Sequence, residues 1–233
     1  MRTALLPSPE VYDDEIKQWP WRKLVERCTV EVAKRAPKNG VVLDYMSGTG
    51  TMLAAVRKKR PDLNLIGCDV SKAYVAFARS KSKSVEHVIG DARKWRPLVP
   101  VDMITFTAGL HHLSFRDQER FLDKVRRELK QGGLCIIGEE ALTAPKRGQS
   151  RTESVVALYA ELFPEILKGK ISNDVMKASL DVMVNDLLCR GEFKRDLHSL
   201  LTAVRKRFTL IEIIRTWPTK DRGCGDYLII ARK

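Results

Sequence analysis

The stretch VVLDYMSGTG, residues 41–50, decides the fold of this chain. Its first half is apolar and ends in Asp44, which predicts a short buried strand. Gly48 and Gly50 then form a turn in which no Cβ keeps a ligand away from the backbone, and a helical run follows over residues 51–59. The N–H groups at the start of that helix point into the turn, where they can bind an anion. A strand, a glycine turn and a helix in this order predict the nucleotide-binding corner of an open α/β sheet.

Three further apolar runs end in polar residues, as expected of strands whose carboxyl ends share one edge of a parallel sheet. The first run ends in Asp69, about 20 residues beyond the turn, where doubly wound folds place a carboxylate that accepts hydrogen bonds from ribose hydroxyls. The second run ends in Asp91, and the third ends in Thr107 and continues into AGLHHL, residues 108–113. We therefore expect these side chains to line one ligand-binding edge.

Strands and helices alternate from residue 40 to about residue 140, which predicts a parallel sheet with helices on both faces. The alternation then stops, and two last strands are expected to form an antiparallel hairpin at the edge of the sheet. The predicted strands are residues 41–44, 63–68, 85–90, 101–107, 134–138, 208–214 and 226–231. The predicted helices are residues 10–35 with a break at Pro20, 51–59, 71–80, 116–130, 152–167, 173–190 and 192–207.

The chain of 233 residues is long enough for one well-buried domain. We expect an N-terminal helical cap (residues 1–39), a cofactor-binding core (40–142), a helical substrate lid (143–190), and a final helix with the hairpin (191–233). No apolar run approaches the roughly 18 residues that a membrane span needs, and the N-terminus lacks the apolar core of a signal peptide. The five cysteines include no Cys-x-x-Cys pair, which predicts buried reduced thiols, no metal site and a cytoplasmic protein.

These residues resemble the class I S-adenosylmethionine-dependent methyltransferases, with matches over roughly residues 41–142. The stretch DYMSGTG, residues 44–50, resembles the acidic-x-Gly-x-Gly-x-Gly loop of that family, with Met46 in place of the first glycine. A dehydrogenase fits less well, because Leu53 stands where the third glycine of Gly-x-Gly-x-x-Gly is expected. The resemblance implies a Rossmann-like three-layer sandwich with a mostly parallel seven-stranded sheet, a helical insertion after the fifth strand, and S-adenosylmethionine as cofactor.

The resemblance also implies which residues contact the cofactor. Asp69 matches the acid that binds the ribose, and Asp91 with Ala92 matches the pair beside the adenine. The turn would donate backbone N–H groups to the carboxylate of the cofactor. From their chemistry, Tyr12 is a candidate for closing the pocket, with core packing as the alternative, and Arg22 could pair with that carboxylate or lie on the surface. The residues expected at the cofactor are Tyr12, Arg22, Asp44, Tyr45, Met46, Ser47, Gly48, Gly50, Asp69, Val70, Asp91, Ala92 and Thr107.

The stretch GLHHL, residues 109–113, resembles the segment after the fourth strand in family members that act on small molecules. A histidine here can take a proton from a hydroxyl, phenol or amine nucleophile, although one imidazole could instead only shape the loop. Glu139 ends the fifth strand on the same edge, where it could accept a proton or be a solvated strand end. The predicted catalytic residues are His111, His112 and Glu139, and the predicted substrate contacts are His112 and Tyr159, for which a role in the core is the alternative.

The leading hypothesis is methyl transfer to a small molecule by a monomer or a homodimer without a membrane partner. A nucleic-acid acceptor is the second hypothesis, because the formal net charge is +13. The basic residues are scattered and are not interleaved with aromatic residues, so no base-stacking groove is predicted. The fourth strand also lacks the Asn/Asp-Pro-Pro-aromatic tetrad that binds a flipped base. A regulatory protein that binds the cofactor without turnover is the third hypothesis.

Overall fold

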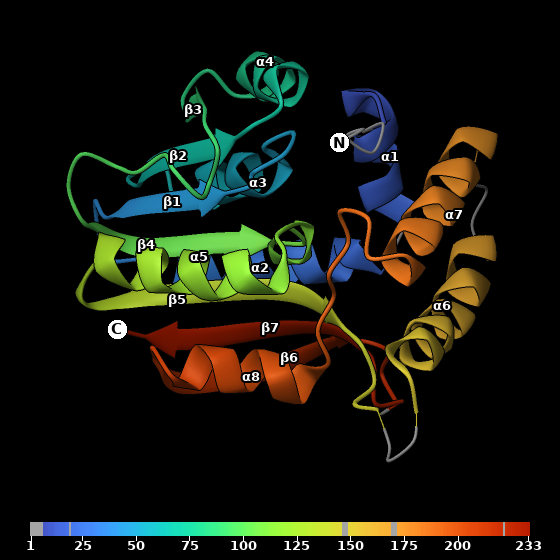
Figure 1. Ribbon diagram of the computed structural model, residues 1–233. Coiled ribbons are helices and arrows are strands. Elements are labelled where there is room, and N and C mark those ends of the chain that lie inside the picture. The colour runs from blue at the N-terminus through green and yellow to red at the C-terminus, as the bar shows by residue number, and fades with distance from the viewer. Residues whose placement is uncertain (1–6, 19, 146–148, 169–171, 221) are drawn as a thin grey trace.

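Figure 1 shows the computed structural model, which describes residues 7–18, 20–145, 149–168, 172–220 and 222–233. Residues 1–6 of the predicted cap, and residues 146–148 and 169–171 of the predicted lid, lie outside the described residues. The described chain forms one sheet of seven strands with helices on both faces. The strands are β1 (Val41–Tyr45), β2 (Asn64–Asp69), β3 (Glu86–Ile89), β4 (Val101–Thr107), β5 (Leu129–Ala141), β6 (Thr209–Trp217) and β7 (Gly225–Arg232).

The strands of the sheet lie in the order β3-β2-β1-β4-β5-β7-β6. Strands β1 to β5 are parallel to their neighbours, whereas β7 is antiparallel to β5 and β6 is antiparallel to β7. The carboxyl ends of β1 to β5 therefore meet at one edge of the sheet. This topology confirms the predicted fold, with a mostly parallel sheet and an antiparallel hairpin at its edge.

The helices are α1 (Pro9–Gln18), α2 (Trp21–Arg35), α3 (Thr51–Lys59), α4 (Lys72–Lys81), α5 (Phe115–Glu128), α6 (Arg151–Leu167), α7 (Asn173–Leu187) and α8 (Leu197–Arg205), with a 3₁₀ turn η1 (Leu110–His112). Side chains alternate between the two faces of each strand. On one face Leu43 and Ile104 pack with α5 and α8, and on the other Val42 and Met103 pack with α2 and α3. The sheet is therefore the middle layer of three.

Three helices cover the edge where the parallel strands end. Figure 1 shows α1 (blue) and α7 (orange) at the end toward which the arrows of β1, β2 and β4 point. The inner side of α6 packs against Trp21, Trp217 and Cys224 in a separate apolar cluster. No helix among the described residues is long and apolar enough to cross a membrane.

Several predicted boundaries differ from the structure, and one of them bears on the site. The helix predicted from residue 192 begins at Leu197, because Cys189 (φ 49°) and Gly191 (φ 84°) take left-handed conformations that end α7, and Asp196 caps α8. Residues 188–196 therefore form an irregular segment that crosses the sheet edge. The helix predicted to end at residue 130 ends at Glu128 in α5. Strand β5, predicted from residue 134, begins directly after it at Leu129.

Candidate active site

The loop after β1 has the shape of an anion cradle. Met46 (φ 55°), Gly48 (φ 53°) and Gly50 (φ 71°) all adopt left-handed conformations, which cost a residue with a side chain about 1–2 kcal/mol. Met46 nevertheless adopts this conformation, and its side chain packs on Gly109, where an added Cβ would lie 2.8 Å from the Cβ of Met46. Helix α3 begins after Gly50 without a side-chain cap, so its first N–H groups are open to a ligand carboxylate.

Asp69 joins this loop to the next helix. Its Oδ2 accepts a hydrogen bond from the N–H of Gly48 at 2.8 Å, and its Oδ1 accepts one from the N–H of Ser71 at 2.8 Å. The residue is 9% exposed, so these bonds fix the carboxylate at the sheet edge. Each oxygen keeps a second lone pair with which it can accept a hydrogen bond from a ribose hydroxyl.

Asp44 supplies a buried acid at the other side of the loop. The hydroxyl of Thr105 donates a hydrogen bond to its Oδ1 at 2.7 Å. Burial raises the pKa of Asp44 to about 7, the hydrogen bond from Thr105 lowers it, and the charge of Asp69 raises it. A carboxylate that is costly to ionise without a partner suits the ammonium group of the cofactor.

At the adenine side of the edge, the carboxylate of Asp91 is paired with Arg93. The side chain of Arg93 donates hydrogen bonds to both oxygens of Asp91 and thereby lowers the pKa of that carboxyl. Ala92 is buried and Val70 is 67% exposed, so both can serve as apolar walls of an adenine site. The N–H of Gly90 donates to the carbonyl of Asp69 at 2.8 Å, which keeps the two strand ends together.

The N-terminal helix α1 covers the glycine loop. The ring of Tyr12 lies against Gly48, where an added Cβ would be 3.3 Å from Cε1 of Tyr12, and its centroid is 5.2 Å from that of Tyr74. This placement agrees with the expectation that Tyr12 closes the pocket.

Asp13, which the sequence did not single out, ties α1 to the loop. Its carboxylate accepts hydrogen bonds from the hydroxyls of Thr49 and Thr51 and pairs with the ammonium group of Lys81. Ser47 is part of the same loop, and its buried Oγ has no hydrogen-bond partner in the described structure.

Three residues predicted at the cofactor have their side chains elsewhere. The hydroxyl of Tyr45 is buried beneath the sheet, where it bonds to Glu128 at 2.8 Å and to Lys124 at 2.6 Å. Arg22 is 61% exposed on α2 and pairs with Glu26 at 3.5 Å. Thr107 turns its hydroxyl toward the sulfur of Cys28 at 3.6 Å. Strand alternation and helix phase decide which side chains face the loop, and they turn these three side chains to other partners.

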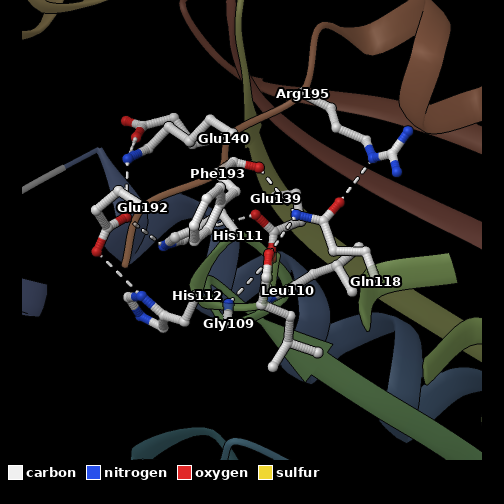
Figure 2. Close-up of polar contacts among 12 residues, drawn as sticks. Gly109, Leu110, His111, His112, Gln118, Glu139, Glu140, Glu192, Phe193 and Arg195 are labelled. Atoms are coloured by element: carbon white, nitrogen blue, oxygen red, sulfur yellow. Dashed lines mark hydrogen bonds and ion pairs between the residues drawn. The ribbon is translucent and has the colours of Figure 1, made fainter. Parts of the chain in front are cut away.

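Glu139 orders the turn η1 from inside the protein. Figure 2 shows its Oε1 accepting hydrogen bonds from the N–H groups of Gly109 (3.0 Å) and Leu110 (2.7 Å), while its Oε2 lies 2.6 Å from Nδ1 of His111. Both side chains are 3% exposed. Glu139 and His111 are thus too buried to meet a substrate directly, in contrast to the predicted catalytic contact.

Glu192 faces the two histidines from the irregular segment 188–196 (Figure 2). Its Oε1 is 3.0 Å from Nδ1 of His112, and its Oε2 is 3.5 Å from Nε2 of His111. Burial alone would raise the pKa of Glu192, but His112, Lys194 and His111 hold it well below its usual value. Burial would likewise lower the pKa of His111, but Glu139 and Glu192 raise it above its usual value. His112 is 48% exposed and is the member of the group that an acceptor can reach.

Lys194 is a buried cation behind this group. Its Nζ lies 3.2 Å from Asp186, 3.4 Å from Glu192 and 3.5 Å from Glu140, and it donates a hydrogen bond to the hydroxyl of Tyr159 at 3.3 Å. Tyr159 is 1% exposed, so it belongs to this buried network and its predicted contact with substrate is not seen. Lys194 could not be recognised from the sequence, because residues 192–207 have the pattern of a helix.

Asp226 lies directly across from Glu140 in the pairing of β5 with β7. Burial raises the pKa of Asp226 well above its usual value, and the charge of Glu140 raises it further.

Comparisons with known proteins agree with this geometry. Residues 42–133 match the family model described as a methyltransferase domain. The demethylmenaquinone methyltransferase of Thermotoga maritima is 28% identical over 154 residues, which are 66% of this chain and 63% of that protein. The trans-aconitate 2-methyltransferase of an Azoarcus strain is 29% identical over 113 residues, which are 48% of this chain and 44% of that protein.

Solved structures show the same fold at low sequence identity. The N-methyltransferase NodS of Bradyrhizobium japonicum in complex with S-adenosyl-L-homocysteine is similar with a TM-score of 0.61 and 13% identity, over 96% of this chain and 98% of that one. A TehB-like S-adenosylmethionine-dependent methyltransferase of Corynebacterium glutamicum gives a TM-score of 0.60 and 14% identity, over 97% of both chains.

These similarities agree with the family predicted from the glycine loop and the strand ends: residues 42–133 match a methyltransferase domain, and the relatives and solved structures named above are methyltransferases. The same comparisons support S-adenosylmethionine as the cofactor. The matches cover less than two thirds of the length of the curated relatives named above.

Proposed function

We propose that this protein transfers the methyl group of S-adenosylmethionine to a small molecule bound beside His112. The bond from sulfur to the methyl carbon breaks as the bond from the acceptor to that carbon forms, so alignment of the three atoms is the main requirement. The observation that carries the proposal is the carboxylate of Asp69, which is fixed by the N–H groups of Gly48 and Ser71 at the carboxyl edge of the sheet.

The residues of the edge fit the cofactor part by part. The loop and the N-terminus of α3 can hold its carboxylate, and Asp44 can hold its ammonium group. Asp69 can accept hydrogen bonds from the ribose, while Val70 and Ala92 can flank the adenine. When bound, the cofactor supplies an electrophilic methyl carbon.

The acceptor site is proposed at η1, under the cover made by α1 and α7. Two relatives are named for small-molecule acceptors, demethylmenaquinone and trans-aconitate. His112 is half exposed there, and Glu192 accepts from its Nδ1, which leaves Nε2 able to contact the acceptor or to take its proton. Direct proton transfer to a histidine suits hydroxyl and phenol acceptors.

Calorimetric titration with S-adenosylmethionine tests the cofactor site. The variant Asp69→Ala removes charge-assisted hydrogen bonds worth about 1.5–3 kcal/mol each, so its affinity should fall about 100-fold. Asp62→Ala is the matched control. Asp62 also accepts a hydrogen bond from a backbone N–H, that of Asn39, but it pairs with Arg60 away from the loop. Equal affinities for wild type and Asp69→Ala would reject the proposed cofactor site.

Methyl incorporation tests the acceptor class. We expect transfer to small hydroxyl or carboxyl compounds and none to RNA or DNA. The net charge of +13 is the observation that favours a nucleic acid instead. Salt-sensitive transfer to RNA, with none to small molecules, would replace the small-molecule proposal with that alternative.

A further inference from the structure

His111, His112 and Glu192 bring three ligand atoms together at the sheet edge (Figure 2). One nitrogen of each imidazole and one oxygen of the carboxylate all lie within 4.8 Å of one another. Glu192 approaches both rings, at 3.5 Å from Nε2 of His111 and 3.0 Å from Nδ1 of His112. Two imidazoles and one carboxylate form a donor set that divalent transition-metal ions bind, often with open positions left for a substrate.

The outer contacts of His111 are those of a metal ligand. Its Nδ1 lies 2.6 Å from Glu139, so the Nδ1–H group donates a hydrogen bond to that carboxylate, and Nε2 faces Glu192. Glu139 is itself fixed by the N–H groups of Gly109 and Leu110. Histidines that bind metals commonly donate their second N–H to a carboxylate, which fixes the tautomer and the ring orientation.

The surroundings are also short of positive charge. We call Glu139, Glu140, Asp186, Glu192, Lys194 and Arg151 the buried charge cluster. This cluster contains four carboxyl groups and two cationic side chains, and His111 and His112 lie against it. Neither oxygen of Glu140 accepts a hydrogen bond in the described structure, although the residue is 2% exposed. Buried carboxylates need compensating charge, and a divalent cation held by the two imidazoles and Glu192 would supply it.

We propose that His111, His112 and Glu192 bind one divalent first-row transition-metal cation, and that its open positions take an oxygen of the acceptor. The second half of this statement rests on the proposed function. A cation lowers the pKa of a coordinated hydroxyl. The hydroxyl proton then leaves to solvent, and the oxygen forms its bond to the methyl carbon as the bond from sulfur to that carbon breaks. With the cation bound, His112 acts as a ligand and the cation takes over its part in removing the proton.

The first experiment measures binding of the metal alone. The full chain is stripped with a chelator and titrated with Zn²⁺ and with Mn²⁺ by calorimetry, and Co²⁺ is added separately to record its visible ligand-field bands. We expect one equivalent of cation and Co²⁺ bands typical of mixed nitrogen and oxygen ligation. Absence of stoichiometric binding for all three cations would overturn the proposal and would mean that protons on the histidines balance the buried carboxylates.

Variants then assign the ligands. His112 is half exposed, so His112→Ala should fold, and its metal affinity should fall by about 100-fold or more. Glu192→Gln should weaken binding in the same way. His198→Ala is the matched control, because His198 is an exposed histidine on α8. Metal binding that is unchanged in both His112→Ala and Glu192→Gln would place the cation elsewhere and reject the site.

The two proposals fail separately. Affinity for S-adenosylmethionine is measured on the same metal-free protein. Cofactor binding without metal binding rejects this inference and leaves the proposed function standing. Metal binding without cofactor binding rejects the proposed function, and with it the claim that the cation holds a methyl acceptor. A shift of the Co²⁺ bands on adding a hydroxyl acceptor supports the second half of the proposal, and unchanged bands with an acceptor that is methylated contradict it.

Discussion

The cofactor half and the acceptor half of the same sheet edge are held together by different kinds of interaction. In the cofactor half, β1 and β2 present backbone N–H groups, left-handed turn conformations and one fixed carboxylate, Asp69. In the acceptor half, η1 and the segment 188–196 enclose the buried charge cluster around Lys194. The first half owes its shape to the path of the backbone, and the second half owes it to compensation between charged side chains.

This difference sets what each half tolerates. A backbone site keeps its donors when a neighbouring side chain changes, but it loses its shape when a Cβ enters the loop. A buried ionic cluster tolerates small changes in side-chain shape. It is destabilised when one charge is removed and its partners stay buried. Mutations can therefore separate the two halves by the kind of change that damages each.

The largest effect is expected from Lys194→Met. The substitution leaves Glu140, Asp186 and Glu192 buried without their shared cation, and breaking a buried ion pair in this way costs about 3–5 kcal/mol. Urea unfolding measures the loss. Lys124→Met is the matched control, because Lys124 pairs with a single carboxylate, that of Glu128, at a less buried position. Equal losses for the two variants would show that the buried charge cluster is no more sensitive to the loss of a cation than a single ion pair beneath the sheet.

The next effect is steric and belongs to the cofactor half. In Gly50→Ala the new Cβ would lie 2.7 Å from Cε1 of His87 and would hold a left-handed conformation, so we expect a loss of about 2–4 kcal/mol in the free energy of unfolding. Gly132→Ala is the matched control, because Gly132 has a similar φ of 76° and nothing within 4 Å of the added Cβ. Its loss should be about 1–2 kcal/mol. Thermal denaturation compares the two, and equal losses would show that the loop has room to relax.

The same contrast explains how far the sequence predicts the molecule. The glycine loop, Asp69 and Asp91 lie within about fifty residues, and each follows an apolar strand, so local pattern places them. The predicted mostly parallel sheet follows from the same alternation and is confirmed. Even in this half, Tyr45 was assigned to the cofactor although its side chain points into the core, because the face of a short strand is hard to read from its sequence.

The acceptor half could not be predicted in this way. Glu192 lies about 80 residues from His112 along the chain, and its segment has the composition of a helix start. Its position depends on Cys189 and Gly191, whose left-handed conformations turn the chain back across the sheet edge. Glu139 was found as a strand-end acid, but its inward direction follows from the hydrogen bonds it accepts from η1. Contacts between distant segments leave no periodic signal.

The pH dependence of the free energy of unfolding tests whether Asp44, a buried acid in the cofactor half, holds a proton in the folded protein. The pKa of Asp44 is raised by burial to about 7 in the folded protein, against about 3.9 for a free aspartate. Between these values the folded protein holds a proton that the unfolded chain has lost. The contribution to the free energy of unfolding is therefore fully present below about pH 4, falls as the pH rises, and is lost above about pH 7.

Unfolding in urea at pH 5.5 and pH 8 measures this contribution. The wild type should lose about 2 kcal/mol more than Asp44→Asn does between these conditions. Saturating S-adenosylmethionine should reduce the difference, because its ammonium group would stabilise the ionised carboxylate. Parallel pH curves for the two proteins would show that Asp44 is ionised in the folded state without the cofactor.

The smallest effect is expected where Asp13 connects α1 to the glycine loop. Asp13→Ala removes the acceptor of Thr49, Thr51 and Lys81, and these partly exposed contacts should cost about 1 kcal/mol in all. Because α1 covers the loop, the loss should appear as faster dissociation of S-adenosylmethionine and faster proteolysis near α1, with little change in global unfolding. Glu10→Ala, an exposed acid on the same helix, is the control. If dissociation is unchanged while proteolysis is faster, α1 opens without controlling the cofactor, and the cofactor half is held by its backbone alone.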